Sequence, residues 1–450
     1  MKYTKKILSM RLVKSLKKNP IWSKFSGGQW AILIVGIVTL FFFSINLFTS
    51  LGSNRPPAPV LYGDVSLANP QQFEKILASA VNSTVESGSP VKILTNGQEF
   101  LPDLLLEIQN ATQSIYITNY IWDGGEFGNT IFRALIEKAK TGVRVYVLLD
   151  GISGRKANDK YIKKLTDLGG KVAYFRPVRW WNVYRINGRT HVREFVIDNK
   201  IAYIGGIAIS DGWLGNATST DSWHDFMFKT SGVMAERSNS VFSNMWSQTT
   251  GEILSVQDSV VEPDKNQGNF ISLFSAPSPD MSGNMEHFIW LSIKAAQTSI
   301  YIQNPYLLPD KSILEALESK AKAGVNVEII VPGRHIDSPH TRWASQSFYR
   351  SLLKAGVKIY EYQPSRIHTK TMVIDGVWSI IGSANLDNRS SQINLESIMG
   401  INDPQLGADL EAKFIEDLGK SREITAEEWS RSSLFMVPIQ RFARLFIHQF

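Results

Sequence analysis

Residues 366–375 read RIHTKTMVID, and residues 382–385 read GSAN. His368 and Lys370 stand two positions apart, so both side chains point to the same side of an extended strand. Asp375 is followed by glycine, which is a turn signal, and the apolar run after it leads back to the second stretch, which predicts a β-hairpin. The hairpin gathers an imidazole, an ammonium, a hydroxyl and a carboxamide around one small space. Groups of these kinds bind phosphate oxygens or attack phosphorus.

A second copy of this pattern begins at His191. In both copies a basic residue follows the histidine by two positions, an aspartate follows the basic residue by five, and a glycine follows the aspartate by seven. Upstream blocks repeat as well: residues 111–117 resemble residues 296–302, and residues 138–143 resemble residues 320–325. Because the repeated blocks keep their order at a nearly constant separation, the sequence predicts two homologous lobes rather than a short-period repeat.

Amphipathic helices and apolar strands alternate in both lobes, which predicts an α/β sandwich for each. The expected helices cover residues 100–112, 130–141, 285–296 and 312–323, and the expected strands cover residues 114–121, 143–149, 299–306 and 325–331. We place the first lobe at residues 91–254 and the second at residues 270–425. The polar and acidic stretch 255–269 is the expected connection between them.

The duplicated pattern resembles the phospholipase D superfamily, whose motif is His-x-Lys-x4-Asp followed by Gly-Ser or Gly-Gly. The order of the blocks is similar to that of bacterial cardiolipin synthases and their phospholipase D-like relatives. Further matching blocks are Asn304-Pro305-Tyr306, residues 383–390, residues 394–396, Glu423-Ile424 and Trp429. The resemblance covers residues 95 to 430, and it implies that the lobes pack about a pseudo-twofold seam where the two motifs meet.

The resemblance also implies a two-step transfer. One histidine attacks phosphorus to form a phosphohistidine, and the other protonates the leaving oxygen and later deprotonates the acceptor hydroxyl. By analogy His191 is the nucleophile and His368 the acid and base, an order that the residues alone leave open. The candidate catalytic residues are His191, Arg193, Asp198, His368, Lys370 and Asp375, and the candidate phosphate-binding residues are Gly206, Ser383 and Asn385. No metal or other cofactor is expected.

Each histidine also needs a partner that fixes its tautomer. The family has an acid after each glycine-containing element, so Glu396 is expected beside His368 and Asp225 beside His191. The aspartates of the two motifs have an alternative role in turns, because each precedes Asn or Gly where a hairpin reverses.

The first motif departs from the family pattern at two positions. Arg193 replaces lysine, which keeps the charge but is bulkier, and Ala208 stands where the second lobe has Asn385. Losing one such donor costs about 2.7–4 kcal/mol in a well-studied enzyme, against the roughly 8–23 kcal/mol that enzymes typically supply. The departure would slow catalysis without abolishing it. A lobe that binds phosphate but is inactive is the alternative.

The amino-acid composition excludes several classes of function. The chain has no cysteine, which excludes disulfides, thiolate catalysis and cysteine-ligated metals. Its net charge of +7 comes from residues 1–29, which hold eight basic residues and no acidic one. The rest of the chain is close to neutral, so we expect no nucleic-acid partner.

Residues 30–50 carry no charged side chain, and a helix of that length spans roughly 30 Å of hydrocarbon. We expect one transmembrane helix, with the basic tail 1–29 in the cytoplasm and the body on the outer side of the cell membrane. A cleaved signal peptide is the alternative. Residues 51–90, which include a proline-rich stretch, are expected to form a linker.

Two further segments suit a lipid surface. Residues 176–185 interleave arginines with tryptophan and tyrosine, as at a headgroup interface, and a packed loop is the alternative. Residues 426–450 have one apolar helical face, which either lies on a bilayer or packs on the domain.

The leading hypothesis is therefore a membrane-bound phosphatidyltransferase of cardiolipin synthase type. It would join two phosphatidylglycerol molecules through a phosphatidyl-histidine and release glycerol. Three alternatives stay open: a phospholipase D that uses water as acceptor, a nuclease, and a non-catalytic lipid-binding protein. The sequence predicts no oligomeric state.

Overall fold

The computed structural model describes residue 26 and residues 28–30, 32–37, 58–179, 187–254, 268–275 and 283–430. The chain divides into two units, Met1–Arg55 and Pro56–Phe450. In the first unit, residues 28–30 and 32–37 are helical, and most of their apolar side chains are exposed. Most of the predicted span 30–50 lies outside the described residues, as does nearly all of the basic tail. Among the residues that are described, no helix combines the length and the apolarity that crossing a bilayer requires.

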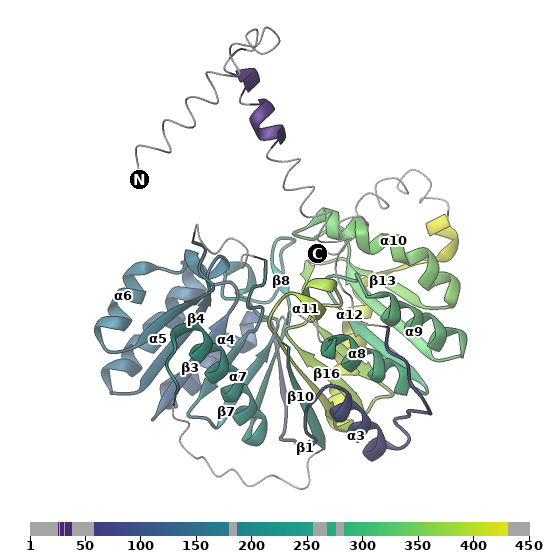
Figure 1. The fold of residues 1–450 in the computed structure, drawn as a ribbon, viewed down its shortest axis with the longest axis horizontal. Coiled ribbons are helices and arrows are strands. Elements are labelled where there is room, and N and C mark those ends of the chain that lie inside the picture. Colours follow the sequence, from purple (N-terminus) through teal and green to yellow (C-terminus); the bar gives the residue numbers. More distant parts are fainter. Residues whose placement is uncertain are drawn as a thin grey trace. The chain divides into compact units, whose positions relative to one another are not determined.

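The second unit holds two lobes, each built on one mixed sheet (Figure 1). The sheet of the first lobe has seven strands, in the order β2 (Lys92–Thr95), β9 (Phe226–Ser231), β7 (Ile201–Gly205), β6 (Glu194–Ile197), β3 (Ser114–Asn119), β4 (Arg144–Asp150) and β5 (Lys171–Phe175). The sheet of the second lobe has nine strands, in the order β1 (Glu86–Ser87), β10 (Asn269–Ser275), β17 (Glu396–Asn402), β16 (Trp378–Gly382), β15 (Thr371–Ile374), β11 (Ser299–Gln303), β12 (Asn326–Pro332), β13 (Lys358–Tyr362) and β18 (Ser421–Ile424).

Corresponding strands of the two lobes pair in the same way. In the first lobe β3 pairs with β4 in parallel and with β6 antiparallel, and in the second lobe β11 pairs with β12 and β15 in the same two senses. The described helices and strands thus confirm the predicted duplication and the α/β class.

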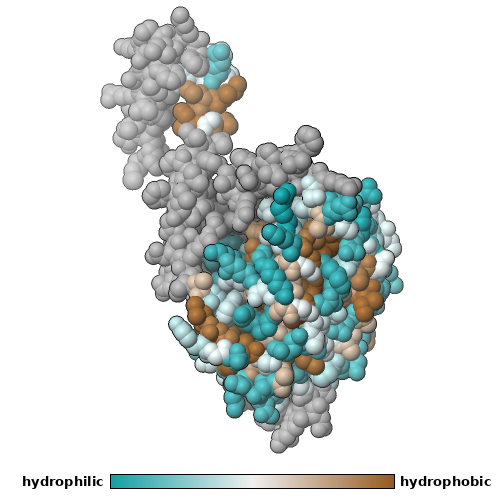
Figure 2. Space-filling model, turned by 90° about the vertical axis from the view of Figure 1, so that its right-hand side faces the viewer, coloured by the Kyte–Doolittle hydropathy of each residue, from teal (hydrophilic) through white to brown (hydrophobic). Residues whose placement is uncertain are grey.

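Apolar helix faces cover both sides of each sheet. The helices of the first lobe are α4 (Asn96–Asn110), α5 (Glu126–Lys140), α6 (Asp159–Asp167) and α7 (Gly232–Thr250). Those of the second lobe are α8 (Asn284–Ala295), α9 (Lys311–Lys322), α10 (Pro339–Ala355), α11 (Asn388–Gln392) and α12 (Pro404–Leu418). On the face of the second lobe that Figure 2 turns to the viewer, hydrophilic and hydrophobic residues are interspersed.

Part of the predicted linker belongs to the second lobe instead. Helix α3 (Pro70–Ala80) packs on α8 and buries Phe73 and Leu77 in the core of that lobe, and β1 pairs with β10 (Figure 1). The prediction of a linker over all of residues 51–90 is therefore wrong. The apolar face of the amphipathic α3 needs an apolar partner. The second lobe provides that partner, although α3 directly precedes the first lobe in the chain.

The lobes meet along a seam that backbone hydrogen bonds and an apolar core hold together. Strand β8 (Trp223–His224) of the first lobe pairs in parallel with β14 (Arg366–Ile367) of the second, and Thr190 forms a bridge to Leu395. Buried side chains from both sheets and from helices α7 and α12 form one cluster across the seam: Ile204, Phe226, Phe228, Met234, Phe270, Val373, Ile381, Met399, Ile401, Leu406 and Leu410. Residues 255–267 of the predicted connection lie outside the described part of the chain.

Candidate active site

The second motif forms the predicted hairpin. Strands β15 and β16 pair antiparallel from Thr371 opposite Ile381, and the turn between them places Asp375 and its glycine at positive φ. His368 and Lys370 stand just before β15, and both are buried. Lys370 Nζ lies 2.9 Å from Nδ1 and 3.1 Å from Nε2 of His368 and donates to the carbonyl oxygen of that residue at 2.7 Å. The imidazole and the ammonium therefore share one side of the chain, as predicted.

The first motif repeats this geometry with a guanidinium. Arg193, which is 1% exposed, donates from Nη1 to the carbonyl oxygen of His191 at 3.1 Å. Its Nη2 lies 3.0 Å from Nε2 of the same histidine. The substitution of arginine for lysine thus keeps a cation beside the ring nitrogen that faces the site.

The carboxylate partners of the two histidines are crossed between the lobes. His191 Nδ1 lies 2.9 Å from Oε1 of Glu396, and His368 Nδ1 lies 2.6 Å from Oδ2 of Asp225. The predicted pairing within each lobe is therefore wrong. The physical reason is the backbone pairing at the seam. The segment before His368 pairs with the segment before Asp225, and the segment before His191 pairs with the residue before Glu396. His191 N–H accordingly donates to the carbonyl of Leu395 at 2.8 Å.

The crossed pairs fix the same tautomer in both rings. A carboxylate accepts, so Nδ1 carries the proton of each neutral ring and Nε2 keeps its lone pair. Burial, with the nearby cations Arg193 and Lys370, holds the pKa of His191 well below its usual value. Burial and Lys370 likewise lower the pKa of His368 to about 3, against the opposing effect of Asp225. Both rings are neutral at physiological pH, and Nε2 of each is unprotonated and lies 3.0 to 3.1 Å from its cation, so it is the nitrogen that can attack or accept a proton.

The two carboxylates differ in their proton affinity. Burial raises the pKa of Glu396 to about 7, although the hydroxyls of Ser383 and Ser390 donate to it at 2.5 and 2.7 Å. Burial also acts on Asp225 and raises its pKa, but the interaction with His368, which donates from Nδ1, and the charges of Lys370 and Arg193 outweigh it and lower the pKa of that carboxyl. Asp225 is thus ionised at physiological pH, whereas Glu396 titrates near it.

The three predicted phosphate-binding residues have different positions. Ser383 donates its hydroxyl to Glu396, and the N–H of Gly206 donates to the carbonyl of Phe226 at 3.2 Å, so in this structure neither offers that group to a phosphate. A Cβ on Gly206 would lie 2.4 Å from Oδ1 of Asp225, so the glycine makes room for that carboxylate. The Oδ1 atom of Asn385 is buried and has no hydrogen-bond partner within the described ranges.

The catalytic role predicted for Asp198 and Asp375 is wrong, and their alternative role in turns is confirmed. Each lies in a hairpin turn at φ 53°, at the far end of its strand from the motif histidine. Each aspartate lies seven positions from its histidine along a largely extended chain, which is roughly 20 Å. Asp198 accepts three backbone N–H groups, from Thr112 to Ser114, at 2.8 to 2.9 Å, and Asp375 does the same for residues 297–299. Both aspartates therefore anchor the start of a central strand.

Several residues that complete the site were missed from sequence. The ring of Tyr120 meets that of His191 edge to face at 5.2 Å, and Trp213 and Trp223 meet His368 in the same way at 5.5 and 5.2 Å. A usable signal existed for Trp223, which begins the Trp-His-Asp stretch, and for Tyr120, which lies at the end of the predicted strand 114–121 and directly follows the observed β3. Trp213 carries no such signal.

A buried ion pair fixes the position of the segment that leads into the first motif. Arg189 Nε lies 3.0 Å from Oδ2 of Asp150, and its Nη2 donates to the carbonyls of Phe175 and Arg176 at 2.9 and 2.8 Å. The guanidinium thus ties the ends of β4 and β5 to the segment that carries His191.

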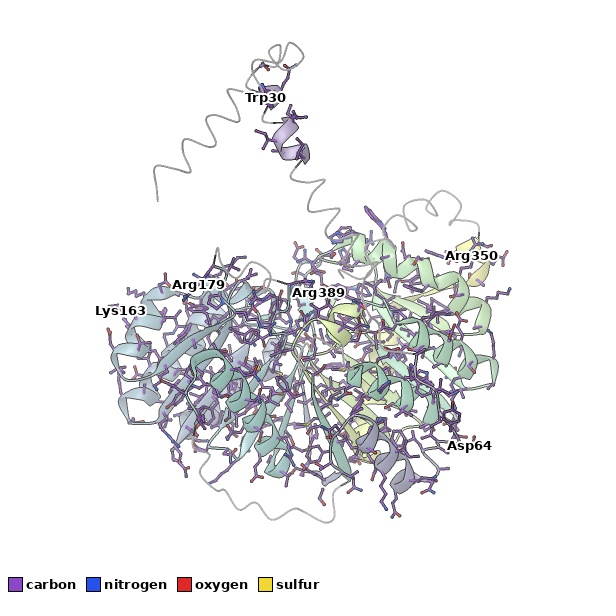
Figure 3. All side chains as sticks on the ribbon, in the orientation of Figure 1. Trp30, Asp64, Lys163, Arg179, Arg350 and Arg389 are labelled. Atoms are coloured by element: carbon purple, nitrogen blue, oxygen red, sulfur yellow. The ribbon has the colours of Figure 1, made fainter. Side chains whose placement is uncertain are left out.

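Arg389 of α11 connects the lobes at the site (Figure 3). It donates to Oδ1 and to the carbonyl of Asn187 at 2.9 and 2.7 Å, and its charge helps to lower the pKa of His191. Asn187 follows the predicted headgroup segment, of which residues 180–185 lie outside the described residues. Residues 431–450 of the predicted C-terminal helix lie outside them too.

Comparisons with known proteins identify a matching family and several relatives. A family model described as "Cardiolipin synthase, PLD-like domain" matches residues 104–246 and 289–418. A cardiolipin synthase of Staphylococcus aureus (strain Mu50) is 35% identical over 350 residues, which is 77% of this chain and 70% of that protein. A cardiolipin synthase of Geobacillus is 34% identical over 369 residues, 81% of this chain and 73% of its own length.

Solved structures share the fold at lower identity. The phosphatidylserine synthase of Haemophilus influenzae superposes with a TM-score of 0.65 at 15% identity, covering 83% of this chain and 97% of its own. The polyphosphate kinase of Porphyromonas gingivalis gives a TM-score of 0.51 at 15% identity, covering 84% of this chain and 54% of its own. These two likenesses concern the fold alone.

Proposed function

The chain belongs to the cardiolipin synthase family of phospholipase D-like proteins, and we propose that it is a phosphatidyltransferase that joins two phosphatidylglycerol molecules into cardiolipin and releases glycerol. The observation that carries the proposal is the pair of neutral, crossed histidines at one seam, each with a cation beside Nε2. A phosphodiester is an anion, so its attack by a neutral nucleophile between two cations avoids charge repulsion.

In the first step, Nε2 of one histidine attacks phosphorus of the donor lipid, a P–N bond forms, and the P–O bond to glycerol breaks. The leaving oxygen takes a proton from the second histidine, so glycerol departs neutral. Because the resting ring of His368 carries no proton on Nε2, that proton comes from Lys370 and passes through Nε2 of His368: burial lowers the pKa of Lys370 to about 7, and its Nζ lies 3.1 Å from that nitrogen.

In the second step, the hydroxyl of the second phosphatidylglycerol attacks the phosphohistidine. The second histidine accepts the hydroxyl proton and returns it to Lys370, the P–N bond breaks, and cardiolipin leaves with the first histidine and the lysine restored. We assign the nucleophile to His191 and the proton carrier to His368. The ionised Asp225 supports this order, because a full negative charge at Nδ1 stabilises the imidazolium that a proton carrier must form.

Purified full-length protein in phosphatidylglycerol vesicles tests the proposal. We expect cardiolipin and glycerol in equal amounts, no product with His368→Ala, and unchanged turnover with His287→Ala, a histidine in α8 outside the site. Phosphatidic acid as the main product would show that water is the acceptor and that the protein is a hydrolase, not a transferase. Cleavage of DNA but not of lipid, or lipid binding without turnover, would refute the assignment.

We also propose that residues 30–50 attach the protein to the cell membrane, with the N-terminus in the cytoplasm and the body outside. The uncharged stretch and the eight basic residues before it support this orientation. Protease treatment of intact spheroplasts should digest the body, and protection of the body would contradict the orientation.

A further inference from the structure

A third buried histidine, which the proposed mechanism does not use, joins the two lobes behind the site. His224 is 4% exposed and directly precedes Asp225. Its Nδ1 lies 3.0 Å from Oδ1 of Asn96 in α4 of the first lobe. Its Nε2 lies 2.8 Å from Oδ2 of Asp417 in α12 of the second lobe. One imidazole therefore bonds an element of each lobe.

The orientation of the Asn96 amide is fixed by its other partners. The backbone N–H of Asp225, which can only donate, points to Oδ1 of Asn96 at 3.0 Å. The amide nitrogen donates to Oδ1 of Asn216 at 3.0 Å. The oxygen of Asn96 is thus the atom that faces His224, and because it only accepts, Nδ1 of His224 must donate.

The second partner also only accepts. Burial raises the pKa of Asp417, but hydrogen bonds from His224 and Gln303 and the charge of Lys420 hold it below its usual value. Asp417 is ionised, and Nε2 of His224 must donate to it as well. A neutral imidazole donates from one nitrogen only, so two acceptors require the imidazolium.

We propose that His224 is a positioning residue: its doubly protonated ring clasps the two lobes and holds Asp225 and His368 in register. This inference rests on the proposed function, because register matters only for a reaction at His368. The carbonyl of His224 accepts the backbone N–H of His368 at 2.7 Å, which places that histidine along the seam. Asn96 bonds both backbone groups of Asp225, its own N–H donating to the carbonyl at 2.9 Å.

The clasp exists on one side of the pseudo-twofold seam only. Leu395 occupies the corresponding position before Glu396, and its apolar side chain is buried in a hydrophobic cluster. Asn96 adopts φ 60° at a buried position, a left-handed conformation that is uncommon outside glycine and is held there by its contacts with His224 and Asp225. The His368–Asp225 pair is therefore braced in a way that the His191–Glu396 pair is not.

Among the charged and titratable groups around His224, Asp417 is the counterion of its ring. The ring of Tyr362 from β13 stacks on His224 at 5.4 Å, and Phe226 meets it edge to face. Lys420 Nζ lies 3.5 Å from the other oxygen of Asp417 and 2.8 Å from Glu416. Of the nearby acids, Asp225 bonds His368, and Asp221 pairs with Arg366 of β14.

Nuclear magnetic resonance of full-length protein labelled with ¹⁵N-histidine, in detergent at neutral pH, tests the protonation state. We expect one ring with both nitrogens protonated, and the loss of its signals in His224→Gln. Asp417→Asn, which keeps the shape but removes the charge, should return that ring to the neutral form. A neutral His224 ring in the folded wild-type protein would overturn the proposal.

Kinetics on phosphatidylglycerol vesicles test the positioning role. His224→Gln should lower kcat roughly tenfold to a hundredfold with KM unchanged, because small displacements of a reacting group have effects of that size. His287→Gln is the control and should keep wild-type kcat. A kcat within twofold of wild type for folded His224→Gln would refute the role. The nuclear magnetic resonance experiment does not depend on turnover. If His224 is an imidazolium in a protein that makes no cardiolipin, the result counts against the proposed function but not against the contact between the lobes.

Discussion

Asparagine at position 225 is expected to harm catalysis far more than glutamine at position 396, although both changes remove one carboxylate charge beside a histidine. The reason lies in what else each carboxylate bonds. Oδ1 of Asp225 accepts the backbone N–H of Phe226 at 2.9 Å, and a backbone N–H can only donate. The oxygen of the new amide must therefore stay at that position, and its nitrogen replaces Oδ2, the atom 2.6 Å from Nδ1 of His368.

An amide nitrogen donates, so His368 Nδ1 would have to accept, and its proton would move to Nε2. The ring then has no lone pair facing the substrate. A wrong tautomer of this kind costs about 10⁴-fold in kcat in a triad enzyme, which is about 5 kcal/mol of barrier.

Glu396→Gln behaves differently because its other partners are the hydroxyls of Ser383 and Ser390, which can donate or accept. The new amide nitrogen can donate to one hydroxyl while its oxygen accepts from His191. Only the charge is lost, and since the pKa of Glu396 is about 7, much of that charge is already absent at neutral pH. A loss of about tenfold follows from the low end of the 1.5–3 kcal/mol typical of charged hydrogen bonds.

Initial rates of cardiolipin formation at pH 7, with circular dichroism to verify folding, give the comparison. Equal losses in folded Asp225→Asn and Glu396→Gln, or a larger loss in the second, would refute the reasoning from hydrogen-bond direction.

Three further predictions concern Gly206, Asp198 and Glu194. Gly206→Ala should lower kcat by roughly a hundredfold while the protein stays folded, because the new Cβ would lie 2.4 Å from Oδ1 of Asp225 and displace it; wild-type rates would show that the carboxylate tolerates the shift. Asp198→Asn should lower the free energy of unfolding by about 1–3 kcal/mol in urea titrations and leave kcat of the folded enzyme unchanged, because this aspartate anchors a strand far from the histidines; a loss of kcat without loss of stability would restore its catalytic role. Glu194 is fully buried, and burial raises its pKa to about 8, so it favours the folded state at acidic pH and that contribution is lost as pH rises from its usual value through 8. Glu194→Gln should therefore raise the Tm at pH 8 and flatten the dependence of Tm on pH, whereas an unchanged profile would show that Glu194 does not control it.

The sequence by itself determined the two lobes, the hairpins and the identity of both motif histidines with their cations. These features depend on local rules: a period of two in strands, turn residues at fixed spacing, and a pattern that occurs twice in the same order. Neighbours in the chain are also neighbours in space there, as His368 and Lys370 are.

Only the tertiary structure decided which carboxylate serves which histidine, where α3 packs, and what His224 does. Glu396 and His191 are 205 residues apart and Asp225 and His368 are 143 apart, so no local spacing records their contacts. Asp225 follows β7 and Glu396 follows the equivalent strand β16. The sequence pattern is therefore the same whether each histidine pairs with the acid of its own lobe or with that of the other lobe. The choice is made at the seam, where the backbone N–H groups of His191 and His368 find their acceptors in the opposite lobe.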